Sequence, residues 1–168
     1  MSHTYTNLLT HLIFSTKDRA PLITAPLEDD LLGYLGGIVR EMGGALRAAN
    51  ARPDHVHLLC SLPPTVATAD AVRVVKTNSS RWLHRSRGFP GFEWQTGYGA
   101  FSVSHSLAPT VVRYIREQEK HHRRVTFQEA SSHGLRHGLR PFARFAGYDS
   151  EPVVATVSAV LTVAFSHA

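Results

Sequence analysis

The chain has 168 residues, 43% of them hydrophobic, and a formal net charge of +5 with eleven histidines. This length allows one domain with its own core, and the positive charge favours an anionic partner. The single cysteine, Cys60, excludes an internal disulfide and a cysteine-rich zinc site. The first residues do not resemble a signal peptide, and no stretch reaches the roughly 20 apolar residues that span a bilayer. We therefore expect a cytoplasmic protein.

The first half of the chain alternates between the patterns of strands and helices. Strand segments are rich in aromatic, β-branched and apolar residues, whereas the helical segment repeats leucine at a helical spacing and ends at Gly43 and Gly44. The predicted order is strand, helix, strand, strand, at residues 5–15, 27–42, 45–51 and 55–62.

The second half adds a helix, a strand and a helix, at residues 68–87, 93–104 and 107–122, with Pro109 suited to the first turn of the last helix. The first six elements predict an α+β protein with a ferredoxin-like split β-α-β arrangement. We expect a four-stranded antiparallel sheet with two helices on one face, the other face open to a ligand, DNA or a second subunit, and one extra C-terminal helix. Residues 1–130 form the predicted domain, and residues 131–168 a C-terminal tail.

Two histidines flank one apolar residue in the strand at residues 55–62. Because strand side chains alternate between faces, His55 and His57 point to one side while Val56 and Leu58 point to a core. Two imidazoles on one face can hold a divalent cation, provided that further ligands come from elsewhere. The alternative is a pair of surface histidines on a half-exposed strand.

The last helix carries Tyr114 and Gln118, which share one face because they are four residues apart. A tyrosine is a useful nucleophile in transesterification at a phosphodiester, where it keeps the bond energy in a phosphotyrosine. His55, His57 and Gln118 together offer two nitrogens and one oxygen, which suits Mg²⁺ or Mn²⁺. The alternatives are a half-buried packing role for the tyrosine and a solvated glutamine.

Basic side chains are concentrated in two places, the helix at residues 68–87 and the loop after the first strand. Such side chains contact phosphates and give salt-dependent affinity for DNA, although a basic helix is often only a solvated face. Trp82 and Trp94 offer rings for stacking on an unpaired base, with core packing as the alternative. The candidate DNA contacts are Lys17, Arg19, Arg73, Lys76, Arg81 and Arg85.

Five ordered segments resemble the single-tyrosine HUH transposases of small insertion sequences and the REP-associated tyrosine transposases. The segments are HLIF at 11–14 with Lys17 and Arg19, PDHVHL at 53–58, Lys76 with SSRWL at 79–83, WQTGYGAFSVS at 94–104, and Tyr114-Ile115 with Gln118-Glu119, His121-His122, Phe127 and Glu129. The resemblance covers about residues 4–130.

The resemblance implies a metal-dependent transposase that cleaves and rejoins single-stranded DNA at the hairpin ends of a mobile element. It implies that His55 and His57 are the HUH metal ligands, Gln118 the third ligand and Tyr114 the nucleophile that forms a 5′-phosphotyrosine. It also implies a homodimer in which the tyrosine helix of one subunit completes the metal site of the other. We expect no nucleotide cofactor and no membrane partner.

The chain departs from this family pattern after Glu129, where Ala130-Ser131-Ser132 and a small apolar tail replace the expected helix and acidic-aromatic segment. Two other functions stay open. One is a domesticated or inactive relative that binds hairpin DNA without cutting it. The other is a non-catalytic ferredoxin-like domain that binds a metal or a small ligand.

Overall fold

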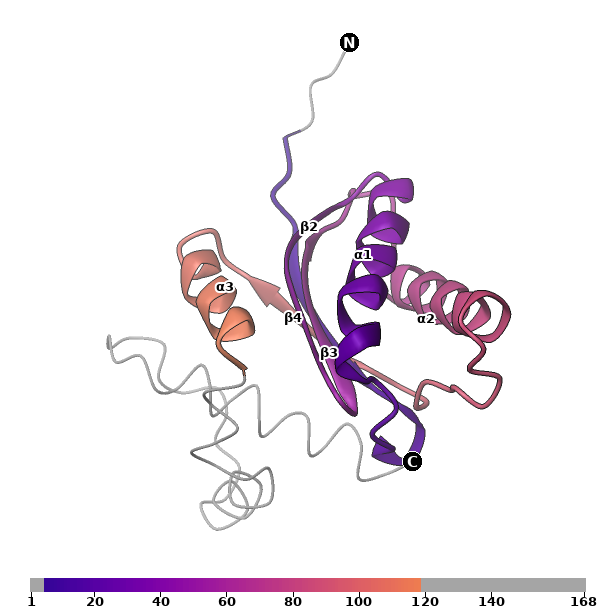
Figure 1. The fold of residues 1–168 in the computed structure, drawn as a ribbon. Coiled ribbons are helices and arrows are strands. Elements are labelled where there is room, and N and C mark those ends of the chain that lie inside the picture. Colours follow the sequence, from indigo (N-terminus) through magenta and orange to yellow (C-terminus); the bar gives the residue numbers. More distant parts are fainter. Residues whose placement is uncertain (1–4, 119–168) are drawn as a thin grey trace, which may run out of the picture. The chain divides into compact units, whose positions relative to one another are not determined.

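The computed structural model describes residues 5–118 of the chain (Figure 1). Their elements are β1 (Leu9–Ser15), the short 3₁₀ turn η1 (Lys17–Arg19), α1 (Ala25–Glu41), β2 (Ala45–Arg52), β3 (His55–Ser61), α2 (Thr68–Ser86), β4 (Gly99–Val103) and α3 (Ala108–Arg116). This order confirms the predicted α+β fold. No helix among the described residues is long and apolar enough to cross a membrane.

The chain divides into two units, Met1–Arg116 and Glu117–Ala168. The first unit holds every element named above. The predicted domain boundary after residue 130, the tail, and the histidines at 121 and 122 all lie outside the described residues.

The four strands form one antiparallel sheet in the order β2-β3-β1-β4. The two central strands, β1 and β3, are almost entirely buried, and their histidines are buried with the apolar residues. In the register, Ser15 lies opposite His55 and Ile13 lies opposite His57. Directly opposed residues share a face of the sheet, so this register fixes which side chains meet.

One face of the sheet forms the hydrophobic core with α1 and α2. Phe14 from β1, together with Val56 and Leu58 from β3, packs there against leucines and valines from the inner faces of both helices. Val56 and Leu58 are fully buried, as the alternation predicts. Figure 1 shows α1 and α2 together on this side.

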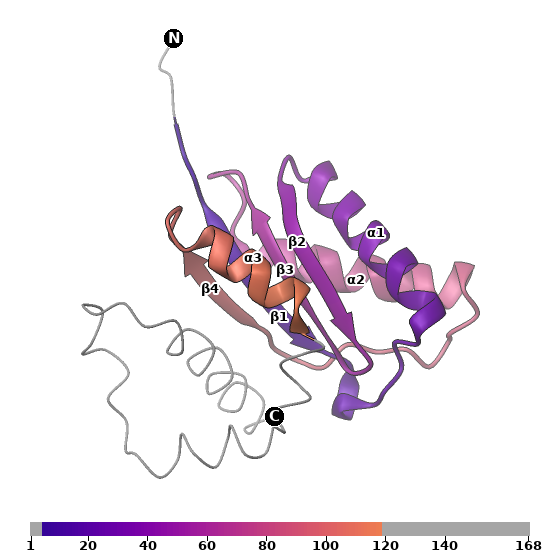
Figure 2. The same ribbon diagram turned by 60° about the vertical axis from the view of Figure 1, so that its left-hand side comes forward.

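The opposite face carries α3, which contacts β2 and β3 (Figure 2). Ser104 stands before this helix: its side-chain oxygen accepts a hydrogen bond from the backbone N–H of Leu107 and its carbonyl one from Ala108. The face that the sequence left open is therefore partly covered by the extra helix.

The strand predicted at residues 93–104 is shorter in the structure. Only Gly99–Val103 forms β4, while Trp94 makes an isolated antiparallel bridge to Thr16. Gly97 between them has a φ of +84°, a conformation that interrupts a strand and that glycine adopts at little cost. The segment therefore pairs along β1 at two separate places, at Trp94 and at β4.

Candidate active site

His55 and His57 both point to the face that carries α3. They are opposed by Ser15 and Ile13 on β1 and by Arg52 and Asn50 on β2. Their side chains are buried, with exposed fractions of 5% for His55 and 1% for His57, and their ring centroids are 5.0 Å apart. The predicted same-face arrangement is confirmed, and the alternative of two surface histidines is wrong because α3 covers this part of the sheet.

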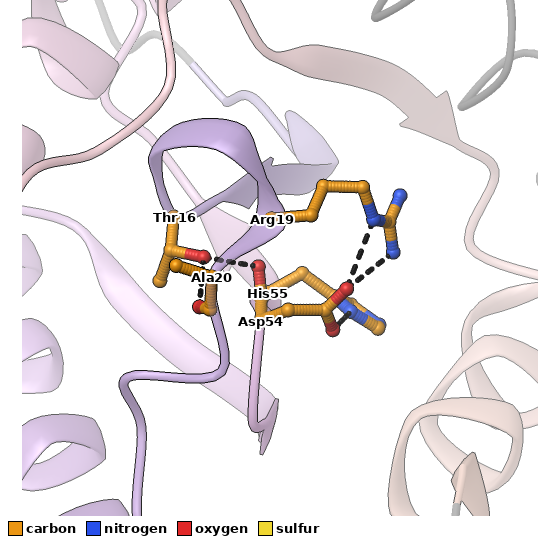
Figure 3. A network of polar contacts seen from close by, with 5 residues as sticks. All are labelled: Thr16, Arg19, Ala20, Asp54 and His55. Atoms are coloured by element: carbon orange, nitrogen blue, oxygen red, sulfur yellow. Dashed lines mark hydrogen bonds and ion pairs between the residues drawn. The ribbon is translucent and has the colours of Figure 1, made fainter.

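A chain of polar contacts supports His55 (Figure 3). Its Nδ1–H donates to Oδ1 of Asp54 at 2.6 Å, and Nε and Nη2 of Arg19 donate to Oδ2 of the same carboxylate at 2.9 and 2.7 Å. Burial raises the pKa of Asp54, but the hydrogen bond from His55 and the charge and hydrogen bonds of Arg19 outweigh burial and hold the pKa well below its usual value. Asp54 is therefore an anion that orients the His55 ring.

A strained turn brings Arg19 to Asp54. Asp18 and Arg19 have φ values of 54° and 53°, in the left-handed region where each non-glycine residue costs about 1 kcal/mol or more. Thr16 stabilises the turn, because its hydroxyl lies 2.6 Å from the carbonyl oxygen of Ala20 and 3.1 Å from that of Asp54. Its backbone N–H also donates to the Asp54 carbonyl at 2.9 Å, so the turn is tied to the residue before His55.

A third histidine, His11 on β1, lies beside His57. Nε2 of His11 is 3.0 Å from Nδ1 of His57, and the two rings stack with centroids 5.2 Å apart. Burial lowers the pKa of His11 to about 4, so its ring is neutral at physiological pH. His11 was not predicted as a site residue, although it shares the histidine face of β1 with Ile13 and Ser15, which lie two and four residues further along the strand.

Tyr114 on α3 completes the cluster from the other side. Its ring is 6.0 Å from the His57 ring and 6.3 Å from the His11 ring, edge-on to both. The side chain is 9% exposed. The structure thus brings the predicted nucleophile next to a predicted metal ligand within one chain; completion of the site by a second subunit stays a prediction.

Gln118, the predicted third ligand, follows α3 in the unit Glu117–Ala168 and is buried. Its role as a ligand stays a prediction. Within the first unit, two buried oxygen atoms on the histidine face have no hydrogen-bond partner among the described residues: Ser15 Oγ, opposite His55, and Asn50 Oδ1, opposite His57.

The imidazoles of His55 and His57 and the oxygens of Ser15 and Asn50 are atom types that bind divalent cations. The described residues hold no group of three or more His, Cys, Asp or Glu side chains arranged for a metal. Two imidazoles with nearby neutral oxygens are instead the donor set that leaves room for phosphate and water on Mg²⁺ or Mn²⁺.

Lys76 on α2 contacts the protein's own backbone. Its ammonium group donates to the carbonyl oxygens of Gln95 at 2.5 Å and Gly97 at 2.8 Å, and lies 5.7 Å from the centre of the Phe14 ring. Burial lowers the pKa of Lys76. These contacts give Lys76 a structural role in holding the segment before β4, while its predicted contact with DNA is untested.

The other predicted DNA contacts divide into two groups. Lys17 forms an exposed ion pair with Glu93, and Arg19 is committed to Asp54 near the histidines. Arg73, Arg81 and Arg85 are exposed on α2, on the side of the sheet away from α3. The basic helix and the histidine cluster therefore lie on opposite faces of the sheet.

The two tryptophans pack within the protein. Trp94 is edge-on to Phe14, and its Nε1–H donates to Ser79 Oγ at 2.9 Å. Trp82 stacks on Tyr34 with centroids 4.5 Å apart and also contacts the guanidinium of Arg87. Both contacts agree with the packing alternative.

Comparison with known proteins identifies the family. A model of the IS200-like transposases matches residues 4–118, so this chain belongs to the IS200-like transposase family. Transposases of this family process DNA, and the histidine and tyrosine cluster lies within the matched region.

Individual relatives agree with this assignment. The ISDra2 transposase TnpA of Deinococcus radiodurans is 29% identical over 114 residues, which are 64% of this chain and 81% of the relative. The crystal structure of a candidate transposase from the same species superposes with a TM-score of 0.54 at 27% identity, over 70% of this chain and 96% of the other. A REP-associated tyrosine transposase bound to a REP hairpin gives a TM-score of 0.55 at 16% identity, over 89% and 94% of the two chains, and shows the same fold.

Proposed function

We propose that this transposase cleaves and rejoins single-stranded DNA in a metal-dependent reaction that passes through a 5′-phosphotyrosine on Tyr114. One observation carries the proposal: the Tyr114 ring lies 6.0 Å from the His57 ring, whose neighbour His55 is 5.0 Å away on the same face. A tyrosine can act as the nucleophile at a phosphodiester, and paired imidazoles beside it can hold a cation that activates the phosphate.

In the proposed reaction the phenolic oxygen of Tyr114 attacks phosphorus. The new bond joins Tyr114 to the 5′ phosphate while the bond to the 3′ oxygen breaks. The phenol loses its proton and the departing 3′ oxygen gains one, so the products are a phosphotyrosine and a 3′-hydroxyl. Rejoining is the reverse attack by a 3′-hydroxyl. The number of phosphodiester bonds is conserved, and no nucleotide cofactor is needed.

His55 and His57, with Gln118 as a third ligand, would hold Mg²⁺ or Mn²⁺. The cation would make phosphorus more electrophilic and stabilise the charge on the departing oxygen. The chain's own contribution is orientation: the Arg19–Asp54 pair holds the His55 ring, and burial beneath α3 limits the water around both imidazoles.

We propose hairpin-forming single strands as the substrate, with a homodimer as the working unit. The relative with the same fold that binds a REP hairpin supports this substrate class. The exposed arginines of α2 supply positive charge on the face away from the histidines, where a hairpin stem can bind while its single-stranded flank reaches Tyr114.

The test is Tyr114→Phe, which removes one oxygen and preserves the ring packing. The variant should bind a labelled hairpin with single-stranded flanks, and Mn²⁺, like the parent, but should form no covalent DNA–protein adduct on a denaturing gel. Tyr98→Phe is the matched control, because Tyr98 packs against the core, and it should form adduct at the parent rate. Adduct formation by Tyr114→Phe would contradict the assignment.

The same experiment separates the alternatives. A domesticated relative binds the hairpin, yet even the parent forms no adduct. A ferredoxin-like domain for a small ligand shows no salt-dependent DNA binding at all.

A further inference from the structure

His11 is buried in the middle of β1 and is not a predicted metal ligand. Its exposed fraction is 1%, equal to that of His57, and its Nε2 faces Nδ1 of His57 at 3.0 Å. A metal-ligating histidine binds the cation through one ring nitrogen, and the group in contact with its other ring nitrogen fixes its tautomer and ring orientation. His11 contacts His57 at Nδ1 and can therefore have this effect on His57.

The hydrogen bond between His11 and His57 can run in two directions, and only one of them puts a lone pair on Nε2 of His57. If His11 donates from Nε2, then His57 accepts at Nδ1 and carries its own proton on Nε2. If His57 donates from Nδ1, its Nε2 carries the lone pair that a cation requires. The direction of this one hydrogen bond therefore decides whether His57 is a ligand.

His55 provides the comparison within the same site. Its Nδ1 contacts a carboxylate of Asp54, which only accepts, so the His55 proton is on Nδ1 and the lone pair on Nε2. At His57, the group in contact with Nδ1 is the Nε2 atom of His11. The two ligands reach the same protonation pattern only if His11 accepts.

We propose that His11 is a positioning residue, whose Nε2 accepts the Nδ1–H of His57 and so fixes the His57 tautomer that presents Nε2 to the cation. The inference rests on the proposed function for the identity of the ligands. The stacking of the two rings, with an interplanar angle of 28°, also limits rotation of the His57 ring.

Two substitutions at His11 separate this role from packing. His11→Phe keeps a ring of similar size but removes the acceptor, whereas His11→Gln returns an acceptor oxygen close to the place of Nε2. Mn²⁺ binding to the metal-free protein, followed by calorimetry, should weaken about 10- to 100-fold in His11→Phe, the range for loss of a group that orients a ligand. His11→Gln should regain most of the parent affinity.

Nitrogen NMR of the metal-free parent gives an independent readout. The His57 ring should carry its proton on Nδ1 in the parent and in His11→Gln, and should lose this preference in His11→Phe. His84→Gln, which changes an exposed histidine on α2, controls for unspecific Mn²⁺ binding and should leave the affinity unchanged.

The proposal is overturned if His11→Phe binds Mn²⁺ as tightly as the parent, or if the parent His57 carries its proton on Nε2. Failure of the proposed function looks different: His55→Ala and His57→Ala would then bind Mn²⁺ like the parent. The NMR spectrum of the parent tests the direction of the hydrogen bond in either case, and also if His11→Phe fails to fold.

Discussion

Lys76 gives the sharpest test of whether a basic residue of α2 serves the fold or the DNA. Lys76→Met removes the ammonium group and keeps an unbranched apolar chain beside Phe14. Two backbone carbonyls, those of Gln95 and Gly97, then lose their donor.

The expected cost follows from those two hydrogen bonds. Bonds to a charged donor contribute about 1.5 kcal/mol each at the low end, and the partial exposure of this site reduces their sum to about 2 kcal/mol. With an m value of about 2 kcal/mol/M, the urea midpoint should fall by about 1 M at an unchanged slope. DNA affinity should keep its salt dependence, because the ammonium group faces carbonyls rather than phosphates.

Arg81→Met is the matched control, since Arg81 is exposed on the same helix. Its unfolding free energy should change by less than about 0.5 kcal/mol. If Arg81 contacts a phosphate, the slope of log affinity against log salt should flatten by about 0.7 to 0.9. A Lys76→Met protein with the parent urea midpoint and a flattened salt slope would refute the structural assignment.

Two further predictions concern the site and the assembly. Asp54→Asn removes the carboxylate that accepts from Arg19 and gives His55 a weaker acceptor. The free energy of unfolding should therefore fall by about 1–2 kcal/mol in urea unfolding, and Mn²⁺ affinity should fall about tenfold in calorimetry. If both values are unchanged, Asp54 does not orient the His55 ring. The edge strands β2 and β4 each have one side that no described strand pairs, so we predict a two-fold homodimer with paired sheets, and sedimentation that shows only monomer at micromolar concentration would contradict it.

Alternation and helical spacing were enough to predict most of the fold. β2, β3 and α2 end within one residue of their predicted bounds. Gly43 and Gly44 come directly before β2, and the Pro53–Asp54 turn separates β2 from β3, so these residues mark the limits of both strands. The strand before α3 was predicted too long. Its composition favours a strand throughout, and only the positive φ of Gly97 shows where pairing stops.

Local sequence patterns predicted only part of the site. His55 and His57 share a local pattern, and Tyr114 lies on a helix whose order in the chain places it after the sheet. His11 is 46 residues from His57 in sequence, so their contact depends on the pairing of β1 with β3 and on register, which no local pattern provides. Lys76 was assigned by charge alone, and charge does not show whether a lysine meets a phosphate or a carbonyl.

Because α2 and the histidine cluster lie on opposite faces of one sheet, substitutions in one should not affect the other. Residues that share no contact contribute to free energy independently, usually within about 0.5 kcal/mol, so a double-mutant cycle between Arg81 and His57 should give almost no coupling energy. If α2 binds DNA as proposed, substitutions in α2 can change the affinity for DNA without changing the histidine cluster. The independence should fail at residues 93–97, which bond both to Lys76 on α2 and to the end of β1.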